Sequence, residues 1–318
     1  MPRLLLGLAL AVILAMPASA QTFPTRGIRL VVGYSAGGGN DLIARILATK
    51  LQDKLGQPVL VDNKPGAESI VAAEYVAKAA PDGYTLLMAP TGVMAINPAV
   101  HARLPYDPLR DFVPISLVAE FPLLLVVGAD QPVKSVRELI DYGRANPDRA
   151  RYASAATPFR LAAELFNQRT GAKFAPVEFR GSGEAVQAVA SGAVLMTISD
   201  AAAIAGPLKD GKVRALAITT AKRPPAFPDV PTFGETGIAD MEIALWTGIV
   251  APAATPADIV SMLHDAIADT LAMPAVEQAL ENIDVDPSGM TSTEFRALIA
   301  RDLERWQAVA RAANVKVE

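Results

Sequence analysis

Apolar runs of two different periods alternate along residues 28–218. The run 28–32 is rich in β-branched residues, and a glycine-rich turn separates it from apolar residues at helical spacing in 42–51. The same succession of strand, short loop and helix then repeats. Such alternation predicts an α/β protein with mainly parallel sheets covered by helices on both faces. The expected strands occupy residues 28–32, 59–61, 84–88, 113–118, 123–127, 151–154, 174–179, 194–198 and 213–218.

Residues that favour helix N-termini mark several of the expected helices. Ser135, with a glutamate three residues later, has the spacing of a capping box, and Thr291 repeats this spacing. Thr255 followed by Pro256 is typical of the first turn of a helix. Apolar residues at helical spacing follow Thr255 and Thr291, so the chain is expected to end in helices.

The length of 318 residues is too great for one ordinary core and accommodates two α/β lobes. Between residues 221 and 255 the chain is Pro-rich and irregular, around an apolar run at 243–250 that can carry it back to the first lobe. We therefore expect four parts: a signal peptide at 1–20, the first part of lobe 1 at 21–121, lobe 2 at 122–242, and a return strand with C-terminal helices on lobe 1 at 243–318.

The first twenty residues have the pattern of an export signal. Arg3 is followed by an apolar run at 4–16 and by the small residues 18–20, which form an A-x-A cleavage site. A membrane anchor is the alternative, but spanning needs about 20 apolar residues and this run is shorter. No cysteine follows that would make a lipoprotein. We expect cleavage after Ala20 and a periplasmic mature chain that begins at Gln21.

Composition narrows the classes of partner and cofactor. Hydrophobic residues make up 51% of the chain, charged residues 19%, and the formal net charge is −4. Without a basic stripe, nucleic acid is not expected as a partner. The chain has no cysteine, and its two histidines, His101 and His264, lie far apart in the sequence. We therefore expect no disulfide, no His/Cys metal cluster and no cofactor.

The strongest candidate for a ligand site is the loop after the first strand. Three consecutive glycines there allow backbone N–H groups to approach a ligand, and Asn40 or Asp41 can cap the helix that follows. The loop is neither a Walker A motif nor a clean dinucleotide fingerprint. An ordinary flexible turn is the alternative. The candidate ligand residues of this loop are Tyr34, Ser35, Ala36, Gly37 and Gly38.

Other candidates lie where later strands lead into helices, because ligands of open α/β sheets bind at these ends. They are Thr91, Ser154, Thr157, Arg160, Ser182 and Asp200. Several have a structural alternative: Thr157 fits a helix N-cap before Pro158, Ser182 and Asp200 can also cap helices, and Thr91 can be an ordinary loop residue.

Arg160 occupies a first helical turn, where the helix dipole disfavours a cation. Its carboxylate partner could be the ligand or Asp200; an ordinary surface arginine is the third possibility. No catalytic residue is assigned, because neither histidine accompanies a G-x-S-x-G nucleophile elbow and no spacing demands a carboxylate pair. We expect the chain not to be an enzyme.

Nearly the whole mature chain resembles the Bug-type receptors of tripartite tricarboxylate transporters. The order and spacing of several short segments carry this resemblance. They lie at 23–32, at the glycines 37–39 with Asp41, and at 62–67, 79–88, 96–98, 104–108, 181–182, 216–217, 223 and 227–232.

The resemblance implies a two-lobed periplasmic solute-binding protein, type II-like, whose lobes are joined by crossing strands and close on one ligand. It implies a small carboxylate as ligand and a membrane permease of the tripartite tricarboxylate type as partner, and we expect a monomer. It also points to Tyr34, Ala36, Gly37, Gly38, Thr91, Ser154, Thr157 and Ser182 as ligand residues. A periplasmic sensor that acts on a signalling partner is the alternative function.

The chain departs from the family pattern beside the expected cleft. Ser35 and Ala36 stand where the family usually has proline, and Glu68 and Ser69 stand in a segment that is usually glycine-rich. Two further departures are an arginine at 160 in place of a frequent histidine, and the pair 199–200 in place of Asp-Asn. The identity of the ligand is therefore not expected to follow from the family.

Overall fold

The computed structural model of the protein describes residues 23–283 and 285–317, so the proposed signal peptide lies outside the described residues. The strands are β1 Ile28–Val32, β2 Val59–Asn63, β3 Thr85–Pro90, β4 Phe112–Gly128, β5 Arg151–Ser154, β6 Ala175–Glu178, β7 Met196–Asp200, β8 Val213–Ile218, β9 Ala244–Pro252 and β10 Asp286–Pro287. The helices are α2 Gly39–Leu55, α3 Ile70–Ala77, α4 Asn97–Val100, α5 Val136–Ala145, α6 Thr157–Thr170, α7 Ser182–Ala190, α8 Ala201–Lys209, α9 Ala257–Leu271, α10 Pro274–Glu281 and α11 Ser292–Ala312. Short helical turns lie at Ala67–Ser69 (η1), Gly92–Ile96 (η2, π-helical) and Pro147–Arg149 (η3).

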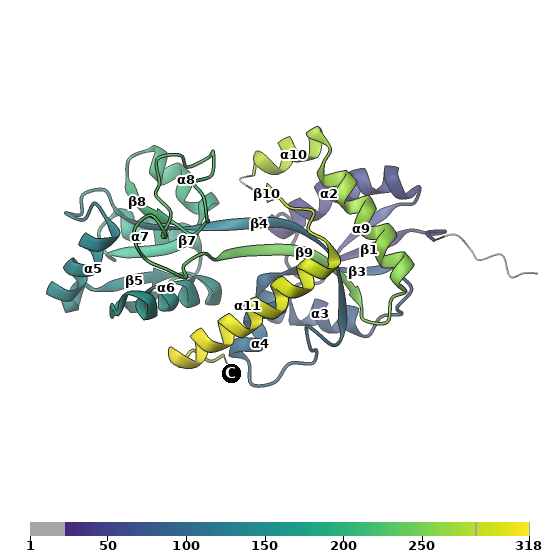
Figure 1. Cartoon of the computed structure of the whole chain (residues 1–318), viewed down its shortest axis with the longest axis horizontal. Coiled ribbons are helices and arrows are strands. Elements are labelled where there is room, and N and C mark those ends of the chain that lie inside the picture. The colour runs from purple at the N-terminus through teal and green to yellow at the C-terminus, as the bar shows by residue number, and fades with distance from the viewer. Residues whose placement is uncertain (1–22, 284, 318) are drawn as a thin grey trace, which may run out of the picture.

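Two lobes are joined by two neighbouring strands: β4 runs through the sheets of both lobes, and β9 lies beside its first part and leads from the second lobe into the first (Figure 1). In the first lobe β2, β1 and β3 pair in parallel, and β9 and β4 extend the sheet antiparallel. In the second lobe β6, β5 and β7 pair in parallel, and β7 and β8 each pair antiparallel with the far half of β4. The predicted α/β fold with two lobes and crossing strands is confirmed.

Helices cover both faces of each sheet, as the alternating pattern predicts. In the first lobe α2 and α9 pack on one face and α3 and α11 on the other. In the second lobe α5 and α6 belong to one core cluster and α7 and α8 to another. No single helix in the described part of the chain is long and apolar enough to cross a membrane; the bent pair α9–α10 reaches that length and apolar composition only when its two helices are taken together.

The last helix contacts both lobes. Phe295 near its start packs in the core of the first lobe, whereas Trp306 and Val309 belong to the cluster that includes Phe166 of the second lobe. Gln168 of α6 donates a hydrogen bond from Nε2 to the Val309 carbonyl oxygen at 3.3 Å. The chain therefore links the lobes three times, through β4, β9 and α11 (Figure 1).

Some expected boundaries are wrong. Residues 113–118 and 123–127 are not two strands but parts of the single strand β4, and α10 and β10 were not expected. The caps at Ser135, Thr291 and Asp200 are confirmed. Three helices begin at other residues than expected. The N-cap of α2 is Gly38 instead of Asn40 or Asp41, that of α6 is Ala156 instead of Thr157, and that of α7 is Gly181 instead of Ser182. Each of these N-caps has an extended backbone conformation, so the helix begins at the residue that follows it.

Candidate functional site

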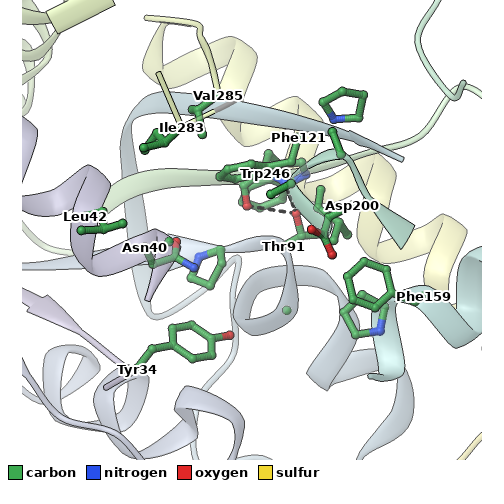
Figure 2. A pocket seen from close by; sticks show the side chains of 18 residues that line it. Tyr34, Asn40, Leu42, Thr91, Phe121, Phe159, Asp200, Trp246, Ile283 and Val285 are labelled. Carbon is green, nitrogen blue, oxygen red and sulfur yellow. Dashed lines mark hydrogen bonds between the residues drawn. The ribbon is translucent and has the colours of Figure 1, made fainter. Parts of the chain in front are cut away.

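A cavity of about 540 Å³ lies between the two lobes (Figure 2). Tyr34, Asn40 and Leu42 lie on one side of it, and Phe159 and Asp200 lie on the other. The first lobe contributes Tyr34, Gly39, Asn40, Leu42, Pro90, Thr91 and Gly92; the second contributes Pro158, Phe159, Asp200, Ala201 and Ala202. The crossing strands add Phe121, Pro122, Leu245 and Trp246, and the segment before β10 adds Ile283 and Val285.

The N-terminus of α2 lies at this cavity and carries backbone N–H groups that have no acceptor among the described residues. Its N-cap, Gly38, makes no side-chain capping hydrogen bond, and the N–H groups of Gly39 and Asn40 donate to no acceptor among the described residues. Both residues line the cavity. The positive end of the helix dipole adds to these donors, so this side of the cavity is suited to an anion such as a carboxylate.

Asp41 holds the glycine loop in shape. Its Oδ2 accepts hydrogen bonds from the Gly37 N–H at 2.8 Å and from Arg45 Nε at 2.9 Å, while Oδ1 accepts from Asn63 Nδ2 at 2.8 Å. Asn63 Nδ2 also donates to the Tyr34 carbonyl oxygen at 3.1 Å. Chiefly because of the hydrogen bond from Arg45, the pKa of Asp41 falls to about 2. One buried carboxylate thus ties the loop to α2 and β2.

Tyr34 supplies a hydroxyl group that stays protonated. Burial, and secondarily the negative charge of Glu68, raise the pKa of Tyr34 to about 12. Glu68 lies in a left-handed stretch in which Ala67, Glu68 and Ser69 have φ of 45°, 52° and 71°. Such angles are unusual for residues other than glycine. Glu68 Oε2 lies 3.4 Å from His101 Nε2.

Thr91 joins β3 to β9 rather than offering a free hydroxyl group. Its buried Oγ1 accepts from the Trp246 N–H at 2.6 Å and donates to the Trp246 carbonyl oxygen at 3.1 Å. The only hydroxyl hydrogen is therefore already used. Thr91 lines the cavity, but its evident role is to fix the position of Trp246.

The second lobe brings one carboxylate to the cavity. Asp200 is the N-cap of α8: Oδ1 accepts from the Ala203 N–H at 2.9 Å, and Oδ2 accepts from Ser199 Oγ at 3.3 Å. The side chain points toward the cavity opposite Asn40 and Tyr34 (Figure 2). The structural and the ligand-facing interpretations of Asp200 are thus compatible.

Of the residues proposed from the sequence, three line the cavity: Tyr34, Thr91 and Asp200. Ser35, Ala36, Gly37 and Gly38 form the loop next to it, whereas Ser154, Thr157, Arg160 and Ser182 are not among the lining residues. Ser154 is fully buried, and its Oγ has no hydrogen-bond partner among the described residues.

Arg160 does not pair with Asp200. Its Nη1 lies 3.4 Å from Glu178 Oε1, across the end of β6. The alternative in which Asp200 is the partner of Arg160 is therefore wrong for this structure, and the partner of the cation in the first turn of α6 is Glu178. The Nε atom of Arg160 is buried and makes no hydrogen bond with the described residues.

Sequence reasoning missed most of the apolar walls. Phe121 and Pro122 lie between two of the predicted strands, and no pattern in the sequence distinguishes Phe159 beside Arg160. Leu245 and Trp246 lie in the apolar run that was expected to return to the first lobe, and this was the signal that could have placed them at the crossing. Ile283 and Val285 follow the unexpected helix α10, so no pattern pointed to them.

Comparison with known proteins decides the family. Residues 43–315 match the family described as tripartite tricarboxylate transporter family receptor. The chain belongs to this family. It is therefore a solute-binding receptor of the periplasmic type, and the resemblance inferred from its sequence segments is confirmed.

Relatives match the receptor over almost its whole length. It is 36% identical over 308 residues to the protein BugT of Bordetella pertussis, covering 96% of this chain and 94% of BugT. The structure of Rpa4515 of R. palustris with adipate has 36% identity and a TM-score of 0.77, covering 92% of this chain and 99% of that one. The structure of MatC of Rhodopseudomonas palustris with bound malate has 32% identity and a TM-score of 0.74, covering 90% of this chain and 99% of MatC.

Proposed function

We propose that this receptor captures one small carboxylate between its lobes and delivers it, unchanged, to a membrane permease of the tripartite tricarboxylate type. The observation that carries the proposal is the pair of unpaired N–H groups of Gly39 and Asn40 at the cavity wall. The description of two related structures with adipate and malate supports the same class of ligand.

Transport follows from a preference of the ligand for the closed arrangement of the lobes. A carboxylate held by α2 also contacts the wall formed by α6 and α8 only when the lobes approach, so it stabilises the closed form by that additional binding. The closed form then docks on the permease. We propose that the receptor works as a monomer, exported by the signal at 1–20 and cleaved after Ala20.

Native mass spectrometry of the receptor purified from the periplasm tests this proposal. We expect a monomer that begins at Gln21, carries a co-purified acid and returns that acid chemically unchanged after incubation. Co-purification with a permease from the same membranes would support transport, whereas capture of a signalling protein would favour the sensor. Chemical conversion of the acid, or failure to bind any carboxylate, would contradict the proposal.

A further inference from the structure

The side chains that form the walls of the cavity carry no positive charge among the described residues. Among the lining residues that the structure describes, Asp200 is the only one with a charged side chain, and neither lysine nor arginine occurs. Polar side chains come from Tyr34, Asn40 and Thr91, and the hydroxyl hydrogen of Thr91 is already donated to Trp246. Most of the remaining wall is apolar. A ligand of more than one negative charge would meet little in these side chains to neutralise it.

The second lobe offers no positively charged side chain on its side of the cavity, and the helix N-terminus of α8 there already carries a carboxylate of the protein. The N-terminus of α8 already binds the Asp200 carboxylate through the Ala203 N–H. In the first turn of α6, Pro158 has no N–H, and the Arg160 N–H donates to the Ala156 carbonyl oxygen. The guanidinium group of Arg160 is paired with Glu178. Within the described residues, α2 is thus the better-suited place for a carboxylate.

We propose, on the basis of the proposed function, that the receptor selects solutes with one carboxylate and an apolar body, and that Asp200 excludes a second carboxylate. The single carboxylate binds the N–H groups of Gly39 and Asn40. The far end of the ligand faces Asp200, which repels another anion and accepts a hydrogen bond from a hydroxyl group. The receptor therefore differs in specificity from a relative whose structure is described with the dicarboxylate adipate.

Calorimetry with ligands that differ only at the far end tests this selection. One series is hexanoate, 6-hydroxyhexanoate and adipate; a second, rigid series is 4-methylbenzoate, 4-(hydroxymethyl)benzoate and terephthalate. In each series we expect the dicarboxylate to bind at least about tenfold more weakly than the monocarboxylates, because like charges are brought together in a low-dielectric cavity. Two series are used so that the result does not depend on the shape of one ligand.

Asp200→Asn is the decisive variant, because asparagine caps a helix as well as aspartate does and the charge alone is removed. We expect this variant to reduce the ratio between the affinities for the monocarboxylate and the dicarboxylate by about tenfold. Asp210→Asn is the matched control, because it makes the same change of charge at the other end of α8, away from the cavity. This control is expected to leave the ratio of the two affinities unchanged.

Tight binding of adipate or terephthalate by the unaltered receptor would overturn the proposed selectivity for monocarboxylates. A ratio of affinities that Asp200→Asn leaves unchanged would overturn it too. Neither result would contradict the proposed function as a carboxylate receptor. Binding of no member of either series would overturn both the selectivity and the proposed function.

Discussion

Gly39 forms part of the cavity wall and has no side chain to cover its N–H group. A Cβ at this position would meet no heavy atom within 4 Å, so the protein itself tolerates a larger residue there. Because Gly39 lines the cavity, we expect such a side chain to occupy space that the ligand needs. The absence of a side chain at this residue therefore matters to the ligand more than to folding.

Gly39→Val is expected to weaken carboxylate binding by about 1.5–3 kcal/mol, the order of one lost charge-assisted hydrogen bond, and to change the melting temperature of the unliganded protein little. Titration calorimetry and a thermal scan measure the two effects. Gly183→Val is the matched control, because Gly183 also lies in the first turn of a helix with open space around it but does not line the cavity. Equal loss of affinity in both variants would contradict a direct role for Gly39.

The rule that ligands bind where helices follow strands selected some of the residues that line the cavity between the lobes. It placed Tyr34, Thr91 and Asp200, which line the cavity, but it also selected Thr157 and Ser182, which do not. The reason is geometric: the rule identifies one edge of each sheet, whereas only some positions along that edge face the other lobe. Which positions do so depends on how the lobes are oriented, and no local pattern in the sequence encodes this.

At the scale of the element, most strands and helices were predictable because each is a short amphipathic or apolar segment between turns. The single strand β4 was not, because Glu120 and Pro122 interrupt its apolar pattern and proline cannot donate to a sheet ladder. The pairing of β4 with β9 accommodates irregularities between Pro114 and Ser116 and between Leu117 and Ala119. Continuity of β4 comes from this partner strand, which is distant in the sequence.

The loop that leads into α2 depends on Asp41, and this dependence makes it sensitive to acid. Because the pKa of Asp41 in the folded protein, about 2, lies below its ordinary value of 3.8, ionised Asp41 stabilises the fold. This contribution is fully present above the ordinary value and is lost as the pH falls through about 2.

Asp41→Asn is expected to lower the melting temperature at neutral pH and to weaken ligand binding, because the hydrogen bonds that Asp41 accepts from the Gly37 N–H and from Arg45 become weaker. Between about pH 4 and pH 2 the variant should lose less further stability than the unaltered protein. Thermal scans over this range measure the difference. Parallel curves for the two proteins would show that Asp41 does not contribute in this way.

At the scale of the whole molecule, three links between the lobes limit how they move. The strands β4 and β9 lie side by side across the junction, and α11 packs on both lobes (Figure 1). The sequence indicated the two crossing segments. It also led to the expectation that the C-terminal helices, within 243–318, lie on lobe 1, whereas α11 packs on both lobes. The contacts of α11 with α6 of the second lobe depend on the length and direction of α11, which become evident only when the lobes are assembled.

The position of Trp246 gives the receptor an optical reporter of its own. The chain has two tryptophans, and Trp246 lies at the cavity with its ring edge-on to Phe295 at 5.2 Å and its indole N–H bonded to Asp302. We expect ligand binding and closure to change the surroundings of this indole, and its emission to change in proportion to occupancy. Trp306 is buried in the core cluster where α11 meets both lobes, and its indole N–H has no partner among the described residues.

Trp306→Phe therefore removes the background fluorescence without breaking a hydrogen bond, and it should retain the whole ligand-induced change. A fluorescence titration of this variant beside the unaltered receptor measures the ligand-induced change in emission. Loss of the change would locate the signal in α11 instead. If the change is retained, the single indole at the crossing of the strands reports each capture and release of the solute in real time, with no label attached.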